Sequence, residues 1–445
     1  MNNTVLTGSI LSSFLKLAIP SILGLIAITT ASIVDGMFIG HYVNAEGLAA
    51  INLLLPYLSL IFGIALMFSI GGAVRAGFYI GQNEFDKSSA IFSQCLIVIV
   101  SIGLLFALFS WLFSDAILSL LGFPETLISV IEPYFHIISL VVVVQITTMV
   151  MYYFIRQDGS QTLGSVALIT GSIINIVLDF LFIAVFSWEL EGAAAATAIA
   201  QTIQLVILSS YFFKKKSKLK IRWQALSGKD LAPIVMNGGS EFINELSAGI
   251  VILVLNWLMI SRIGIHGVAA FAVINYLIFI SLMLYYGIAD ALHLVISQNY
   301  GAKKYARIQA YLITASICIL VLSLSLVILL VIHPDLVSGL FLDNDLHSTH
   351  SLSQQFIGII WPLFLINGIN IIISVYLTAI GQAIPSMTIA LLRGLILPTS
   401  LLVIMSLLLT DDLFLIALPV SEWVTFIVAI VMLCKYRPTS LLRKE

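Results

Sequence analysis

Charged residues are scarce in this sequence. Only 9% of its 445 residues are Asp, Glu, Lys or Arg, whereas 60% are hydrophobic. An average soluble domain carries about 25% charged residues, so the composition excludes a water-soluble globule and, more firmly, an intrinsically disordered chain. The formal net charge of -2 leaves no basic surface for nucleic acid. The class that remains is a polytopic membrane protein.

Cysteines and cofactor motifs are also lacking. The three cysteines, Cys95, Cys318 and Cys434, lie far apart in apolar runs and read as small buried hydrophobes, not as a disulfide set or a metal site. There is no Walker P-loop, no GxGxxG after a strand and no HExxH. We therefore expect no cofactor. Any active transport must use an ion gradient, and one proton that crosses 100 mV supplies about 2.3 kcal/mol.

Apolar runs long enough to cross a membrane fill most of the chain. Each transmembrane helix needs roughly 20 apolar residues. The predicted spans are 14–40, 49–79, 90–113, 127–155, 163–186, 193–213, 232–261, 269–299, 308–332, 354–380, 386–409 and 413–434. Basic and acidic connections alternate between them, and the positive-inside rule places the basic ones, with both termini, in the cytoplasm.

The two halves of the sequence resemble each other at a nearly constant offset. Residues 47–50 (GLAA) match 267–270 (GVAA), Gly81 matches Gly301, and Asp115 matches Asp335. An even number of spans in each half makes the repeats parallel, a common plan of transporters that expose a central cleft to alternate sides.

This repeat predicts an all-α protein of twelve transmembrane helices in two pseudo-symmetric six-helix bundles. The expected parts are an N-lobe at 1–213, a basic cytoplasmic linker at 214–230, a C-lobe at 231–434 and a cytoplasmic tail at 435–445.

Ionisable residues inside the N-terminal spans indicate a functional site. A charge at the bilayer centre costs roughly 2.5–3.5 kcal/mol on insertion scales, so such residues usually face a cavity. Asp35 lies in the first span, together with the helix-bending Pro20. Asn175 and Asp179 are spaced i, i+4 in the fifth span and share a helix face. With Thr197 of the sixth span, they offer oxygen ligands for a small cation or a hydrogen-bond network around a proton. Hydrogen bonding between helices without an ion is the alternative.

Embedded acids of the C-terminal half are candidates for substrate binding or coupling. Glu245 and Asp290 lie inside spans seven and eight, whereas Glu241 and Glu422 lie nearer the expected membrane faces. Arg393 is the embedded base and could pair with one of these acids, in which case its role is structural.

Three segments resemble multidrug and toxic compound extrusion (MATE) transporters. They are Pro20 with residues 33–40 (IVDGMFIG), residues 175–183 (NIVLDFLFI) and residues 191–201 (EGAAAATAIAQ). Asp35 in the first span, with Pro20 upstream, is similar to the DinF-like branch. The resemblance implies a V-shaped pair of six-helix lobes and export of cationic or amphipathic compounds in exchange for protons or sodium. It also implies that Asp35, Asn175, Asp179 and Thr197 form the N-lobe cation site and that Pro20 permits bending of span one. The position of Glu245 matches the C-lobe acid of another branch.

We therefore expect a cation-coupled multidrug antiporter, not an enzyme, that works as a monomer in the lipid of a bacterial inner membrane. Its partners are small drug-like or cationic molecules, and the expected coupling ion is the proton. Sodium at Asp35, Asn175, Asp179 and Thr197 is the alternative, with no other metal. Protonation of Asp35 would let span one bend at Pro20 and release the solute outward. Two other functions stay open: a lipid-linked saccharide flippase, which needs a cationic cleft, and an intramembrane enzyme.

Overall fold

The structure is a computed structural model that describes residues 4–43, 45–215, 217–222, 228–339, 347–409 and 412–438. Within these ranges every regular element is a helix. Twelve of the helices are long and apolar enough to cross a membrane. The predicted all-α class and the predicted number of spans are confirmed. Helices satisfy every backbone hydrogen bond internally, which a lipid environment demands.

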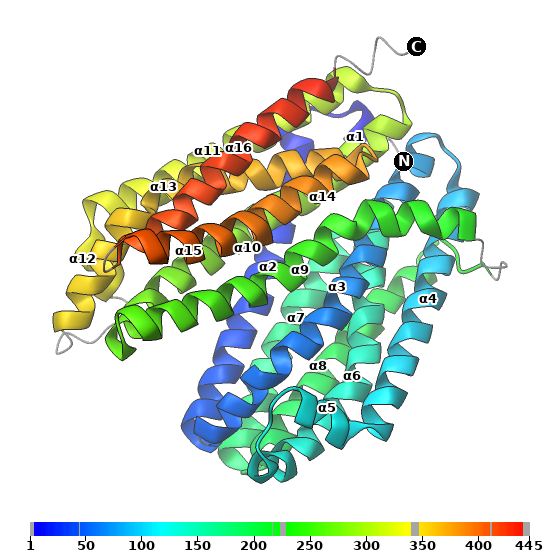
Figure 1. Ribbon diagram of the computed structural model, residues 1–445. Helices are drawn as coiled ribbons and strands as arrows, with labels where there is room; N and C mark the ends of the chain where they lie inside the picture. The colour runs from blue at the N-terminus through cyan, green and yellow to red at the C-terminus, as the bar shows by residue number, and fades with distance from the viewer. Residues whose placement is uncertain are drawn as a thin grey trace. The chain divides into compact units, whose positions relative to one another are not determined.

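The helices follow one another along the chain with short connections (Figure 1). In order, the elements are α1 (Thr4–Thr7), α2 (Ile10–Phe38), η1 (Ile39–Val43), α3 (Ala45–Gly81), α4 (Phe85–Leu112), α5 (Ser114–Leu120), α6 (Glu125–Gln157), α7 (Gln161–Asp179), η2 (Phe180–Val185), α8 (Glu189–Ser209), η3 (Ser210–Phe213), α9 (Gly228–Arg262), α10 (Ile265–Gly301), α11 (Tyr305–Ile332), α12 (Pro334–Gly339), α13 (His347–Ala379), α14 (Ala383–Leu391), η4 (Leu392–Ile396), α15 (Leu397–Leu408), η5 (Leu413–Ile416) and α16 (Ala417–Lys435).

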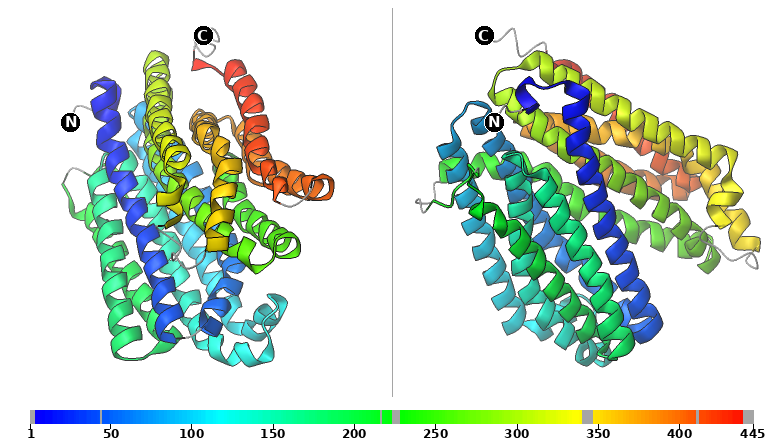
Figure 2. Two further views of the ribbon diagram at one scale, coloured as in Figure 1. Left: turned by 90° about the vertical axis from the view of Figure 1, so that its left-hand side faces the viewer. Right: turned by 180° about the vertical axis from the view of Figure 1, so that it is seen from behind.

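The chain forms two compact units. Unit 2 is Ile19–Gly238, and unit 1 combines Met1–Ala18 with Gly239–Glu445. The boundaries therefore fall inside helices α2 and α9, each of which contributes to both units. Figure 2 shows α2, in blue, as one continuous helix. The expected lobe boundaries at 213 and 231 stay a prediction. Residues 216 and 223–227 of the expected linker, and 439–445 of the expected tail, lie outside the described residues.

The internal repeat is visible in matched helix lengths. Helices α3 and α10 both have 37 residues, α4 and α11 both have 28, and α6 and α13 both have 33. The turns after α3 and α10 also match, since Asn83 and Lys303 have positive φ angles of 62° and 58°. The repeat inferred from the sequence is thus a repeat of helices and turns.

Each unit has its own apolar core. The core of unit 2 is centred on helices α3, α4, α6 and α8, and that of unit 1 on α10, α11, α13 and α16. Small residues let the helices approach closely, as expected where lipid supplies no hydrophobic driving force between helices. Gly171 on α7 is such a contact, because a Cβ atom there would lie 2.1 Å from Nε2 of Gln204 on α8.

Candidate functional site

The predicted site of the N-terminal half lies in unit 2. Asp35 is half-buried on α2, and Asp179, the last residue of α7, is fully buried at 0% exposure. A π-helical segment starts directly after Asp179, and another, η1, starts four residues after Asp35. Such π-helical turns occur frequently at functional sites. Both acids therefore lie where the regular α-helical pattern ends.

The two carboxyl groups lie within electrostatic range of each other. Asp35 and Asp179 interact electrostatically with each other and with Tyr134 of α6. Asn175 donates from Nδ2 to Oδ1 of Asp179 over 3.5 Å, as their i, i+4 spacing predicts. Among the described residues, no donor reaches Oδ1 of Asp35 or Oδ2 of Asp179, although both atoms are buried. A buried polar atom without a partner is rare and requires an explanation.

Two other predicted residues lie farther from this pair. Thr197 is half-buried on α8, which packs against α7, and its hydroxyl makes no hydrogen bond to the carboxylates within the part of the chain that the structure describes. Pro20 lies on α2, and its carbonyl accepts a hydrogen bond of 2.7 Å from Oγ of Ser165 on α7. The structure thus brings together Asp35, Asn175 and Asp179, and adds Tyr134.

The donor set suits a proton or a small hard cation. Two carboxylates and an amide oxygen are ligands of the kind that hard cations prefer. Across the described residues, no group of three His, Cys, Asp or Glu side chains is arranged to hold a metal ion. A transition-metal site therefore has no support in these residues.

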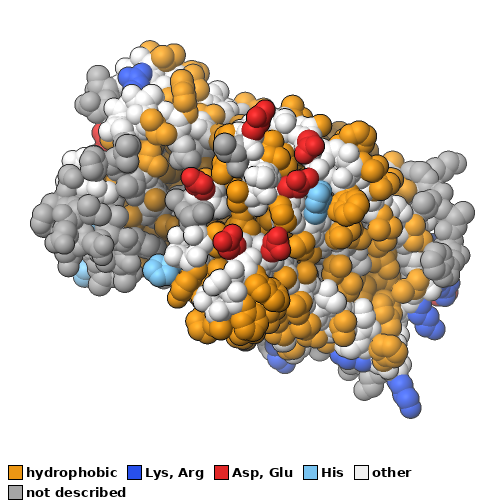
Figure 3. All heavy atoms as spheres, turned by 90° about the horizontal axis from the view of Figure 1, so that it is seen from below, with side chains coloured by type: hydrophobic (Ala, Val, Ile, Leu, Met, Phe, Trp, Pro, Cys, Tyr) orange, Lys and Arg blue, Asp and Glu red, His pale blue; other side chains and the backbone are white. Residues whose placement is uncertain are grey.

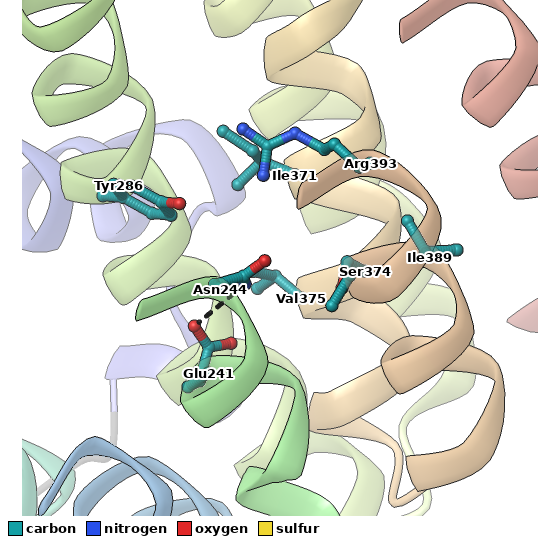
Figure 4. Close-up of a pocket in the computed structure, with 9 residues that line it drawn as sticks. Glu241, Asn244, Tyr286, Ile371, Ser374, Val375, Ile389 and Arg393 are labelled. Atoms are coloured by element: carbon teal, nitrogen blue, oxygen red, sulfur yellow. Dashed lines mark hydrogen bonds between the residues drawn. The ribbon is translucent and has the colours of Figure 1, made fainter. Parts of the chain in front are cut away.

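Unit 1 contains a small pocket lined by polar groups from four helical elements (Figure 4). Glu241 and Asn244 come from α9, Tyr286 from α10, Ser374 from α13 and Arg393 from η4. Figure 4 shows Glu241 and Asn244 stacked on one side of the pocket and Arg393 facing them. Asn244 donates from Nδ2 to Oε2 of Glu241 over 3.5 Å. The pocket therefore places an acid and a base on opposing walls.

Arg393 is also paired with a buried acid, Glu422, which does not line the pocket. Its Nε donates to Oε1 of Glu422 over 3.2 Å, and its Nη2 donates to the side-chain oxygen of Asn367 over 3.3 Å. Asn367 and Asn370 each donate to one carboxylate oxygen of Glu422, over 2.9 and 2.7 Å. Glu422 is only 5% exposed, so the ion pair is buried and its hydrogen-bonding groups are well matched.

The predicted acids of the C-terminal half surround Glu241. Asp290 is buried, Glu245 is half-buried, and both interact electrostatically with Glu241. In addition, Nε2 of His293 lies 3.8 Å from Oε1 of Glu241. Glu241, which the sequence places near a membrane face, is therefore the central acid of this cluster.

Sequence reasoning missed several polar residues of this unit. His293 lies three residues after Asp290, so the shared face of α10 was a signal that could have identified it. Asn367 and Asn370 have the same i, i+3 spacing on α13, in an otherwise apolar span. Amide side chains inside a span require hydrogen-bond partners, so a polar residue of another span was to be expected beside them. In the structure this residue is Glu422.

The charge of the connecting segments is uneven. Exposed acids lie in the first turns of several helices of unit 2: Glu46 in α3, Asp115 in α5, Glu125 in α6 and Glu189 in α8. Figure 3 shows one face on which acidic side chains gather among hydrophobic ones, with Lys and Arg near its margin. This asymmetry is the pattern from which the positive-inside rule assigns orientation.

Comparison with known proteins decides the family. The MatE family model matches residues 20–181 and 247–404, which is more than half of the chain. The chain belongs to the MatE family. Membership confirms the predicted resemblance to MATE transporters, and with it the prediction of a transporter and not an enzyme.

Several MATE proteins are similar to the chain over nearly its whole length. The multidrug export protein MepA of Staphylococcus aureus is 23% identical over 393 residues, which cover 87% of this chain and 86% of MepA. A MATE crystal structure in complex with MaL6 superposes with a TM-score of 0.91 at 20% identity and covers 99% of both chains. An outward-facing MATE transporter superposes with a TM-score of 0.90 at 20% identity and covers 98% of both chains. These likenesses confirm the MATE fold.

Proposed function

We propose that this MATE protein is a proton-coupled multidrug efflux antiporter of a bacterial inner membrane, of the DinF-like branch, with both termini in the cytoplasm. The family and its multidrug export relatives support drug efflux. The observation that supports the coupling is the pair of Asp35 and Asp179, each with a buried carboxylate oxygen that no described donor reaches.

Electrostatics explains why such a pair would bind a cation. A buried carboxylate is costly unless it is paired or hydrogen-bonded, and a second carboxylate nearby increases the cost of keeping both ionised. A proton shared within the pair relieves both costs. Sodium bound by the oxygens of Asp35, Asn175 and Asp179, with Thr197 as a fourth ligand, is the alternative occupant.

Coupling would then be a population shift between two states. A ligand can shift a conformational equilibrium only by its differential affinity for the two states. Protonation of Asp35 removes the charge that Asp179 and Tyr134 experience in unit 2. We infer that the rearranged site bends α2 near Pro20, where the proline removes a backbone hydrogen bond, and that the solute leaves outward. A monomer is sufficient for this cycle.

The alternative of a lipid-linked saccharide flippase has less support. Such a flippase would need an embedded cation to bind a pyrophosphate. Arg393, the embedded base that the sequence indicates, has its guanidinium paired with Glu422. We therefore propose an exporter, in which the polar cluster around Glu241, Glu245 and Asp290 contacts the solute or contributes to coupling.

Vesicles with separately imposed gradients test the proposal. Purified protein is reconstituted with a cationic dye such as ethidium, and efflux is driven by a proton gradient or by a sodium gradient. We expect the proton gradient alone to drive efflux, and Asp35→Asn and Asp179→Asn to abolish gradient-driven efflux. The control is Asp115→Asn, an exposed acid of the same unit. Full proton-driven efflux by Asp35→Asn would overturn the proposed mechanism.

A further inference from the structure

The chain's N-terminal turn is tied to the start of α11 through its backbone carbonyls. Nη2 of Arg307 donates to the carbonyl of Val5 over 2.9 Å and to that of Gly8 over 2.8 Å. The hydroxyl of Tyr311 also donates to the Val5 carbonyl, over 3.0 Å. These side chains lie one turn apart on α11 and bind the same stretch of backbone.

Two further side chains, from the end of α10 and the turn that follows, complete this contact. Nδ2 of Asn299 donates to the Val5 carbonyl over 3.3 Å, and Nζ of Lys304 donates to the Leu6 carbonyl over 2.9 Å. We name the set of Asn299, Lys304, Arg307 and Tyr311 the N-terminal clasp. Its donors bind carbonyl groups near the C-terminal end of a helical turn, where such groups lack helical partners and cations are favoured.

The contact continues into the first turns of α2. Phe14 is fully buried, with its ring centroid 6.4 Å from that of Tyr311. Leu17 and Ala18 are buried as well, at 7% and 2% exposure. Residues 4–18 therefore form an arm that packs with unit 1, although α2 continues into unit 2.

Immediately after this arm, α2 is bound to unit 2. The Pro20 carbonyl accepts a hydrogen bond from Ser165, and the Ser21 hydroxyl accepts one from Nη2 of Arg156. Pro20 itself has no N–H, so the carbonyl of Lys16 loses its helical partner at this point. The turn at residues 16–20, which lacks this hydrogen bond, thus lies between a stretch bound within unit 1 and a stretch bound within unit 2.

We propose that the N-terminal clasp is a set of positioning residues for transport. The clasp holds the arm of α2 on unit 1. Residues 16–20 then act as a hinge, and through this hinge a movement of unit 1 displaces the part of α2 that carries Asp35. The clasp acts through α2 and touches neither solute nor coupling ion. Its role goes beyond the proposed function but rests on it for the efflux readout.

Two measurements on Arg307→Gln test the clasp. The first is labelling of Val5→Cys by an impermeant maleimide, in a background with Cys318→Ala and Cys434→Ala, because Val5 is buried beneath the clasp and Cys95 is fully buried. We expect labelling to speed up by about tenfold or more, as expected when charge-assisted hydrogen bonds that hold a segment closed are lost.

The second measurement is proton-driven ethidium efflux. We expect the maximal rate to fall by about tenfold, while the dye concentration at half-maximal rate changes by less than about twofold, because the clasp does not contact the solute. Arg307→Lys keeps the positive charge and offers ammonium N–H donors in place of the guanidinium, and it should restore most of the rate. Lys215→Gln, an equal charge change at an exposed position of the linker, is the matched control and should behave as wild type.

These outcomes separate the clasp from the coupling site. Asp35→Asn should leave the labelling of Val5→Cys unchanged, so a failure of the coupling proposal would still leave the labelling test of the clasp valid. If Arg307→Gln does not fold, Tyr311→Phe removes one hydrogen bond to Val5 and keeps the ring against Phe14, and we expect the same two effects at smaller size. Unchanged labelling, or rapid labelling with full efflux, would overturn the proposal.

Discussion

The buried ion pair of unit 1 gives the sharpest prediction of stability. Glu422→Gln removes the carboxylate that accepts hydrogen bonds from Arg393, Asn367 and Asn370 over 2.7 to 3.2 Å. It leaves the guanidinium buried without its counter-charge. Loss of one partner of a buried pair costs roughly 3–5 kcal/mol. At roughly 2–4 °C per kcal/mol for a unit of this size, the melting temperature should fall by at least about 6 °C.

A double-mutant cycle shows whether pairing is the cause. Replacing both charged partners by apolar residues of similar volume is often neutral or stabilising. We therefore expect Arg393→Met/Glu422→Leu to melt well above Glu422→Leu alone and above Arg393→Met alone. The assay is thermal unfolding in detergent, followed by intrinsic fluorescence at two heating rates. A double variant whose loss equals the sum of the single losses would refute the reasoning, because uncoupled residues give additive effects.

Two further predictions concern residues of unit 2, and the first has a glycine of unit 1 as its control. Gly171→Ala should destabilise the protein by about 1–3 kcal/mol, because the new Cβ would lie 2.1 Å from Gln204. Gly358→Ala, whose Cβ would meet nothing within 4 Å, should be neutral or stabilise by up to about 1 kcal/mol; equal melting shifts for both would contradict this. Asp158→Asn should speed trypsin cleavage at 214–220 severalfold, because Asp158 accepts hydrogen bonds of 2.5 Å from Tyr211 and 2.8 Å from the backbone N–H of Lys218. Unchanged cleavage would show that Asp158 does not hold this segment.

Composition and spacing were sufficient to predict most of the fold. Apolar run length determines the spans, because each helix must cross the same thickness of hydrocarbon. The repeat was predictable because Asp115 and Asp335 begin matching short helices, α5 and α12. The contact of Asn175 with Asp179 followed from helical geometry alone, since residues four apart share a face.

Contacts between distant segments could not be predicted in this way. Arg393 and Glu422 are 29 residues apart, and their pairing depends on how η4 packs against α16. The π-helical turn at Leu392–Ile396 also changes the face on which Arg393 lies. No residue pattern in the sequence predicts this turn. The N-terminal clasp binds backbone carbonyls, which are the same in every residue, so the sequence of residues 5–8 carries no signal of it.

Proton release on solute binding tests the central claim most directly. Purified protein in weakly buffered detergent is mixed with ethidium, and the pH change is followed with an indicator dye. If Asp35 exchanges a proton for the solute, wild type releases protons as the dye binds, whereas Asp35→Asn binds dye and releases none. Equal proton release from Asp35→Asn and wild type would contradict the account.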